Sequence, residues 1–394
     1  MPQLPSLLRR RDGHHARVTF EELFFDLVYV FAVTQLSHLL LHHLGWMGVA
    51  ETTVLWFAVW LGWQYTCWLT NWFDPETPHI RALLFLSMLA GLVMAASIPR
   101  AFGDAGLLFA GSYATMQVGR AAFIVACLPR GHALAANYRR ILGWMLIAAT
   151  FWLAGGLAEH EHRLLLWALA VACEYVSPML GFPLPGLGRS RTRDWTIEGG
   201  HLTERCQLFV IVALGETVLA SGVALSEAEV WTPELLLALL TTFVSTLGLW
   251  WLYFGTSGKT ATDVITHAED PGRMGASFHY IHAILVGGVI VAAVGHDLVM
   301  AHPQSAPSAA QAAAVVAGPI LFLLGCALYK RIVTRALPRS HLVGALALLG
   351  MALASGQMGL LTLGALVAAI LLAVSLWERW VCAAALAPSQ GASH

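Results

Sequence analysis

Long apolar stretches dominate this sequence and limit the folds open to it. Of the 394 residues, 58% are hydrophobic and 11% are charged, whereas soluble domains carry roughly 25% charged residues. Twelve windows are apolar and long enough to cross a lipid bilayer as helices. The sequence therefore predicts an all-α polytopic membrane protein of about 12 transmembrane helices, although the last two windows could form one helix kinked at residues 355–357. The windows are 19–40, 50–73, 80–99, 106–128, 140–158, 163–181, 201–222, 233–255, 276–298, 309–329, 341–356 and 358–379.

The loop charges predict an orientation for these helices. If the amino terminus is cytoplasmic, the segments on that side hold all of the Lys and Arg residues except four. Arg100 and Arg163 fall outside, and Arg120 and Arg205 fall within windows. Because positive residues concentrate in cytoplasmic loops, both termini are predicted to be cytoplasmic.

The chain also shows signs of an internal duplication. An offset of 182 residues carries Glu22 onto Glu204 and Trp68 onto Trp250. Chance alignment of apolar windows is the alternative interpretation. Six windows in each half predict two parallel six-helix repeats, an arrangement found in transporters with the binding site between the halves. The predicted parts are a cytoplasmic basic N-terminus (1–18), a first six-helix repeat (19–181), a cytoplasmic linker (182–200), a second six-helix repeat (201–380) and a cytoplasmic tail (381–394).

Several ionisable side chains fall inside the windows. Glu22 and Asp26 are four residues apart and share a helix face, and His201, Arg205 and Glu216 lie on one stripe of the seventh window. A charge at mid-bilayer costs at least about 3 kcal/mol, so such groups persist only when paired or hydrated. We predict a polar path for an ion or small solute, lined by Glu22, Asp26, Gln35, Arg120, Glu174, His201, Glu204, Arg205, Glu216, His279 and His282.

A structural interpretation of the same charges stays open. Residues at the window ends can sit at the membrane interface, and Arg120 or Arg205 can pair with a carboxylate as a structural pin. Glu216 is the best single functional candidate, because no basic residue lies close to it in the sequence.

Other classes of site find little support. His279 and His282 have a usable helical spacing for a metal, but no His-Glu-x-x-His motif or Walker loop is present. We therefore predict no metal site and no cofactor. A net charge of −1 gives no basic face for nucleic acid. The six Cys residues stand singly in or beside apolar runs, so we interpret them as buried hydrophobes.

Two motifs resemble the hallmarks of the bacterial low temperature requirement protein A family. The run FEELFFDLVYV at residues 20–30 resembles the opening of its members, and His201-Leu202-Thr203-Glu204-Arg205, followed by Leu214-Gly215-Glu216-Thr217, resembles the second hallmark. Cys206-Gln207 departs from the Phe-Gly expected in many members. The resemblance covers most of the chain and implies a multipass bacterial inner-membrane protein. It implies no reaction, because the family name describes growth in the cold.

The sequence favours secondary transport, or proton or ion translocation, over two other functions. A membrane-embedded enzyme acting on a lipid or polyprenyl substrate would use the same carboxylates and histidines as acid or base. A non-catalytic assembly or sensing component would need its buried charges paired. The sequence names neither the solute nor the oligomeric state.

Overall fold

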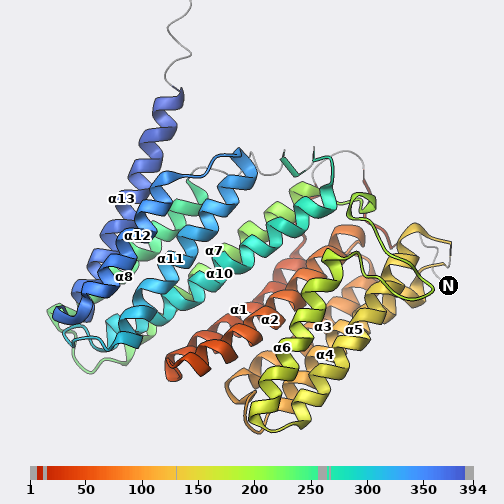
Figure 1. Ribbon diagram of the computed structural model, residues 1–394, viewed down its shortest axis with the longest axis horizontal. Helices are drawn as coiled ribbons and strands as arrows, with labels where there is room; N and C mark the ends of the chain where they lie inside the picture. Colours follow the sequence, from red (N-terminus) through yellow and green to blue (C-terminus); the bar gives the residue numbers. More distant parts are fainter. Residues whose placement is uncertain (1–6, 12–15, 130, 256–263, 266–267, 387–394) are drawn as a thin grey trace, which may run out of the picture. The chain divides into compact units, whose positions relative to one another are not determined.

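The computed structural model describes residues 7–11, 16–129, 131–255, 264–265 and 268–386, and Figure 1 shows that their regular structure is helical. Twelve long α-helices run through these residues, the shortest with 16 residues. They are α1 (Phe20–His42), α2 (Trp46–Trp72), α3 (Pro78–Ser97), α4 (Gly106–Cys127), α5 (Ala133–Leu157), α6 (His160–Met179), α7 (Gly199–Glu227), α8 (Pro233–Phe254), α10 (Pro271–Ala301), α11 (Ala309–Thr334), α12 (Arg339–Ala354) and α13 (Leu360–Leu386).

Each predicted window corresponds to one of these helices. The last two windows form separate helices, because the short 3-10 helix Ser355–Gln357 (η4) lies between α12 and α13. Nine helices among the described residues are long and apolar enough to cross a membrane. The other three, α2, α4 and α6, carry more polar side chains such as Gln64, Arg120 and Glu174.

The described chain divides into two compact units. Unit 1 comprises Met1–Leu39, Trp46–Cys206 and Ile265–Ser277, and unit 2 comprises Leu40–Gly45, Gln207–Val264 and Phe278–His394. The first residues of α7 therefore belong to unit 1 and the rest of that helix to unit 2.

Unit 1 is an up-and-down bundle. At one end, a hydrophobic cluster joins Trp72 at the end of α2 and Leu128 after α4 to Ile80 near the start of α3 and Tyr138 near the start of α5. At the other end, Arg163 of α6 donates hydrogen bonds to the carbonyls of Ala101, Gly103, Gly155 and Ala158. These bonds occupy carbonyls at the end of α5 and in the turn that follows α3.

Unit 2 contains a second set of closely packed helices. Helix α8 packs against α11 and α13, and α12 packs against both α11 and α13. Helices α10 and α11 meet through glycines: a Cβ added to Gly318 would lie 2.3 Å from the backbone nitrogen of Ala292. Small residues of this kind let helix backbones approach closely within a membrane.

Candidate functional site

A capping box places Glu22 at the start of α1. The Glu22 carboxylate accepts the backbone N–H of Thr19 (2.9 Å), and the Thr19 hydroxyl accepts the N–H of Glu22 (3.4 Å). This reciprocal pair satisfies two backbone donors in the first turn, where a negative charge also stabilises the helix dipole. The same Glu22 oxygen accepts a hydrogen bond from Arg9 Nη2 (3.0 Å). Contacts with Thr19 and Arg9 therefore hold Glu22 at the start of α1.

The start of α7 is fixed by a second polar arrangement. The Glu198 carboxylate accepts the N–H groups of Gly200 and His201. Asn71, near the end of α2, accepts the N–H of Glu198 and donates to the carbonyl of Glu198. These contacts set where α7 begins and hold the His201 side chain beside α1.

Two polar pairs join α1 and α7 one helical turn apart. Glu22 Oε1 lies 2.7 Å from His201 Nε2. Asp26 accepts hydrogen bonds from Arg205 Nη1 and Nη2 at 2.9 and 2.8 Å. On each helix the residue of the second pair follows that of the first by four positions, Glu22 to Asp26 on α1 and His201 to Arg205 on α7. The two helices therefore run parallel here. All four side chains are at most 1% exposed. We call them the α1/α7 charge network.

Asp26 makes the most complete contacts in this network. Trp63 Nε1 donates to Asp26 Oδ1 at 2.7 Å, in addition to the two bonds from Arg205. The Arg205 guanidinium also lies 5.5 Å from the centre of the Trp63 ring. A bidentate pair with a further donor compensates for the desolvation of both charges.

His201 is held in one tautomer by Asn71. The side-chain oxygen of Asn71 accepts the N–H of Glu198. The side-chain NH₂ group of Asn71 therefore faces His201 Nδ1, at 3.1 Å. A nitrogen that faces an NH₂ group must accept. His201 therefore carries its proton on Nε2 and donates it to Glu22. Neutral His201 also balances the local charge, since Glu22 and Asp26 are matched by Arg9 and Arg205.

Arg120 and Glu174 belong to a second polar chain in unit 1. Arg120 donates to the carbonyl of Gly62 (3.2 Å), to the Thr66 hydroxyl (2.6 Å) and to Gln117. Of the two arginines expected to pair with a carboxylate, Arg205 does so with Asp26. Among the described residues Arg120 donates only to these neutral acceptors, so the expectation was wrong for Arg120.

A relay of side chains connects Arg120 to Glu174 instead. Gln117 donates to the Tyr113 hydroxyl (3.0 Å), which donates to Glu174 (2.8 Å). One face of α4 carries Tyr113, Gln117 and Arg120. The Gln117 and Tyr113 side chains therefore connect Arg120 to Glu174, which Arg120 does not contact directly. This arrangement spreads the Arg120 charge over neutral acceptors.

The remaining predicted site residues are not members of the α1/α7 charge network as defined here. Glu204 accepts the backbone N–H of Val18 (3.2 Å). Gln35 is half-buried on α1, about 14 Å beyond Asp26 at 1.5 Å per residue. In unit 2, Glu216, His279 and His282 are buried, and His282 Nε2 lies 2.7 Å from the Tyr253 hydroxyl.

Several polar residues of these networks were not predicted. Arg9 lies outside every window, and Trp63 and Asn71 are uncharged, so a search for charges inside windows passes over all three. In unit 2, Lys330 donates to Glu378 (2.6 Å), which also accepts from Ser340. The sequence could have indicated this pair, because Lys330 and Glu378 are oppositely charged residues at the ends of two predicted windows.

A ladder of hydroxyls in unit 2 was also missed. The hydroxyls of Thr217 and Thr246 lie 2.8 Å apart, and Ser221 donates to Thr242 at 2.9 Å. Hydroxyl residues at i and i+4 on both α7 and α8 were the available signal. In the described part of the chain, no group of three or more His, Cys, Asp or Glu side chains could hold a metal ion.

The helices and their buried ion pairs define a polytopic α-helical membrane protein of bacterial type. Residues 17–376 match the family described as bacterial low temperature requirement A protein (LtrA). The chain belongs to this family. It is similar to an uncharacterized protein of Rhizobium meliloti (strain 1021), with 39% identity over 94% of this chain and 91% of the relative. No solved structure matches the chain.

Proposed function

We propose that the protein is a secondary transporter, or a proton or ion translocator, whose path includes the α1/α7 charge network. The observation that carries the proposal is the position of Arg9. One side of Arg9 pairs with the buried Glu22, and the residue also lines a cavity of about 440 Å³ at the same end of unit 1. An intramembrane carboxylate is thus one side chain away from a space that water can enter.

The hydrogen bonds of Glu22 suit a carboxylate that can replace one donor by a proton or a cation. Its two oxygens face different donors, with His201 on Oε1 and Arg9 and Thr19 on Oε2. A proton or cation that reaches Glu22 from the cavity side competes with Arg9 without disturbing the Asp26–Arg205 pair. Buried ionisable groups of this kind mark ion and proton pathways in membrane proteins.

The packing order supports a twelve-crossing architecture of two parallel repeats. In unit 1, α2 packs with α4 and α6, α4 with α3 and α5, and α5 with α6. In unit 2, α8 packs with α11 and α13, α11 with α10 and α12, and α12 with α13. Each of these unit 1 contacts has a counterpart six long helices later in unit 2, whereas the α11–α13 contact of unit 2 has no counterpart among them. The parallel pairing of α1 and α7 fits six crossings, an even number, from the start of α1 to the start of α7.

The distribution of Arg residues supports an orientation with the Arg9 end of unit 1 in the cytoplasm. Arg9, Arg11, Arg140 and Arg189 all lie around the cavity at that end, and basic residues favour the cytoplasmic side. In the proposed orientation, both termini are cytoplasmic and the network opens toward the cytoplasm.

Flux through purified protein tests the proposal. The full chain is reconstituted into liposomes that enclose a pH-sensitive dye, and a pH gradient and a membrane potential are imposed in turn. We expect the gradient to dissipate faster than in protein-free liposomes, in a manner that depends on potential. The measurement is repeated with different salts and small anions added in turn. If the gradient dissipates no faster than in protein-free liposomes under every one of these conditions, the proposal is contradicted.

A further inference from the structure

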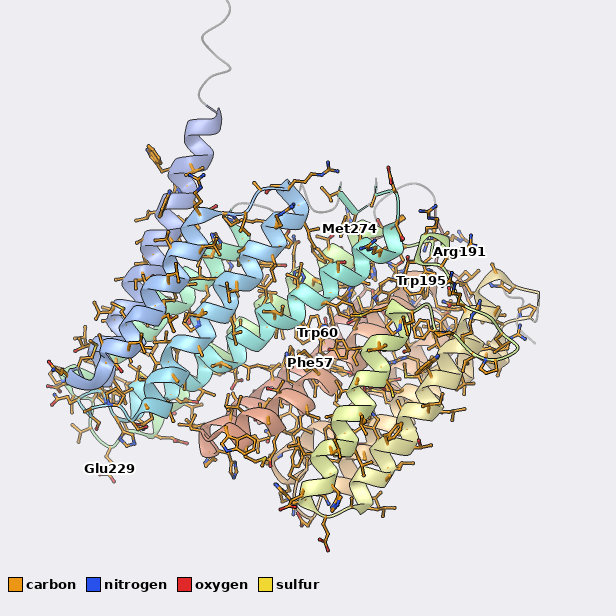
Figure 2. The ribbon with its side chains drawn as sticks, viewed as in Figure 1. Phe57, Trp60, Arg191, Trp195, Glu229 and Met274 are labelled. Carbon is orange, nitrogen blue, oxygen red and sulfur yellow. The ribbon has the colours of Figure 1, made fainter. Side chains whose placement is uncertain are left out.

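The cavity beside Arg9 is built from four separate segments of unit 1. It is bounded by residues 8–11 ahead of α1, by Trp72 at the end of α2, by the first turns of α5, and by residues 189–196 ahead of α7. Figure 2 labels Trp195, which lies in the last of these segments. The volume of the cavity, about 440 Å³, falls within the range of small-molecule sites, ~300–1,000 Å³.

The charge of the cavity wall is strongly one-sided. Its described residues include four arginines and His132, and none of them is a carboxylate. Arg9 pairs with Glu22, but Arg11, Arg140 and Arg189 form no ion pair with a carboxylate of any described residue. Three guanidinium charges around one space repel one another unless an anion lies between them.

Arg140 gives the clearest indication of a missing partner. Its Nε and Nη1 atoms are buried, yet neither has a hydrogen-bond partner in the described part of the chain. A basic residue retained only for membrane orientation would direct its donors to open water. A buried donor left unpaired costs about 1–3 kcal/mol, and more when it is charged. Arg140 also lines the cavity, so a rotation of its side chain would bring these donors to an anion bound there.

Neighbouring groups are arranged to assist such an acceptor. Arg11 donates to the carbonyl of Thr196 (2.9 Å), which fixes its side chain at the wall. Burial lowers the pKa of the Arg11 guanidinium from its ordinary value; the charge of Arg9 adds to this effect and that of Glu198 opposes it. Ala133 and Leu134, at the amino-terminal end of α5, also line the space. The positive end of the helix dipole therefore adds to the arginine charges.

The segment that carries Arg189 is held firmly in place. Ser190 donates its N–H to the carbonyl of Gly181 (2.7 Å), and Gly181 has a φ of 77°. A Cβ at Gly181 would lie 2.1 Å from the Ser190 carbonyl oxygen, so only glycine allows this approach. Trp195 Nε1 donates to the Ser190 hydroxyl (2.7 Å). The indole therefore presents hydrocarbon, rather than a donor, to the cavity.

We propose that this cavity is a binding site for a small organic anion whose phosphate or carboxylate group is held by Arg140, Arg189 and Arg11. Planar guanidinium groups bind these oxygens in bidentate fashion. The half-apolar wall favours an organic anion over a bare inorganic ion. The anionic group can come from a soluble metabolite or from a lipid headgroup, and binding at this site does not depend on transport.

Anion-dependent stability of the detergent-purified full chain provides the first test. Melting is followed during titration with sodium phosphate or glycerol 3-phosphate, with sodium chloride at equal ionic strength as reference. We expect saturable stabilisation of the wild type. Arg140→Gln and Arg189→Gln should each raise the half-saturating concentration about tenfold or more, the cost of losing a charge-assisted hydrogen bond.

Two neighbouring arginines supply matched controls. Arg139 and Arg191 are not among the residues that line the cavity, so Arg139→Gln and Arg191→Gln should keep the wild-type half-saturating concentration. Arg140→Gln should fold normally without anion, because it removes donors that lack partners. Arg189 is exposed, so Arg189→Gln keeps the test valid if Arg140→Gln is unstable.

A lipid arm identifies the source of the anion. The same variants are reconstituted in nanodiscs of equal parts phosphatidylglycerol and phosphatidylcholine, and retained lipids are counted by native mass spectrometry. Retention of phosphatidylglycerol by the wild type, and its loss in Arg140→Gln and Arg189→Gln, assigns the site to a lipid headgroup. If neither soluble anions nor phosphatidylglycerol distinguishes these variants from their controls, or if chloride reproduces the stabilisation, the proposed site does not exist.

Discussion

Asp26 on α1 and Arg205 on α7 form a bidentate ion pair in which both guanidinium Nη atoms donate to the carboxylate, at 2.9 and 2.8 Å. Neither side chain is more than 1% exposed. The pair joins residues 179 positions apart in the sequence. It therefore ties the first helix of the chain to the start of the seventh long helix.

Removal of one partner of this pair should destabilise the protein. Arg205→Ala leaves the Asp26 charge buried without its counterion, which costs roughly 3–5 kcal/mol. We expect less folded protein in membranes and a lower melting temperature in detergent. Fluorescence size-exclusion chromatography and thermal melting measure both effects. Wild-type yield and melting temperature would show that the pair contributes nothing to the fold.

The double variant Asp26→Leu/Arg205→Met should recover part of that loss. Replacement of both charges by apolar groups avoids the stranded ion, although Trp63 Nε1 then lacks its acceptor. Its melting temperature should therefore exceed that of Arg205→Ala. A fall in melting temperature equal to the sum of the falls in Asp26→Leu and Arg205→Met would show that the residues act independently.

The His201 tautomer can be observed directly. In protein labelled with ¹⁵N-histidine, His201 should show a protonated Nε2 and an unprotonated Nδ1, because Asn71 donates to Nδ1. Asn71→Leu removes that donor and should allow the other tautomer to appear. Wild-type His201 with a protonated Nδ1 would contradict the assigned orientation of Asn71.

The close contact between α10 and α11 gives a prediction about packing. Gly318→Ala places a methyl group against the backbone of Ala292 and should cost about 1–3 kcal/mol or more, because a backbone cannot move aside as a side chain does. Gly350→Ala on α12 is the control, since a Cβ there meets nothing within 4 Å. Melting of the two variants in detergent compares them. Equal stability of the two variants would argue against tight packing at Gly318.

Reporter fusions test the orientation. Fusions that end at Gly131, between α4 and α5, and at Leu337, between α11 and α12, should report the cytoplasm. A fusion at Gly103, between α3 and α4, should report the outside. An active alkaline phosphatase at Gly131 or Leu337 would contradict the twelve-crossing topology.

Helices were easier to predict from this sequence than contacts between them. Apolar windows fix where helices run, because the bilayer requires about 20 apolar residues for each crossing. The rotation of α1 against α7 depends on packing, so the windows identify Glu22 and His201 as buried polar residues without showing that they touch. Arg9 was missed because it lies outside the windows. Arg120 was assigned the wrong kind of partner because neutral acceptors on α2 and α4 reach it first.

Proton flux in Glu22→Gln liposomes tests the central claim most directly. Glutamine keeps the shape of Glu22 but cannot exchange a proton. Glu21→Gln is the matched control, since Glu21 is adjacent and pairs with Arg81 outside the α1/α7 charge network. The account predicts that Glu22→Gln still folds, with a lower melting temperature because Arg9 loses its counterion, and loses the protein-dependent flux, while Glu21→Gln retains it. Full flux in Glu22→Gln would remove the α1/α7 charge network from the transport path.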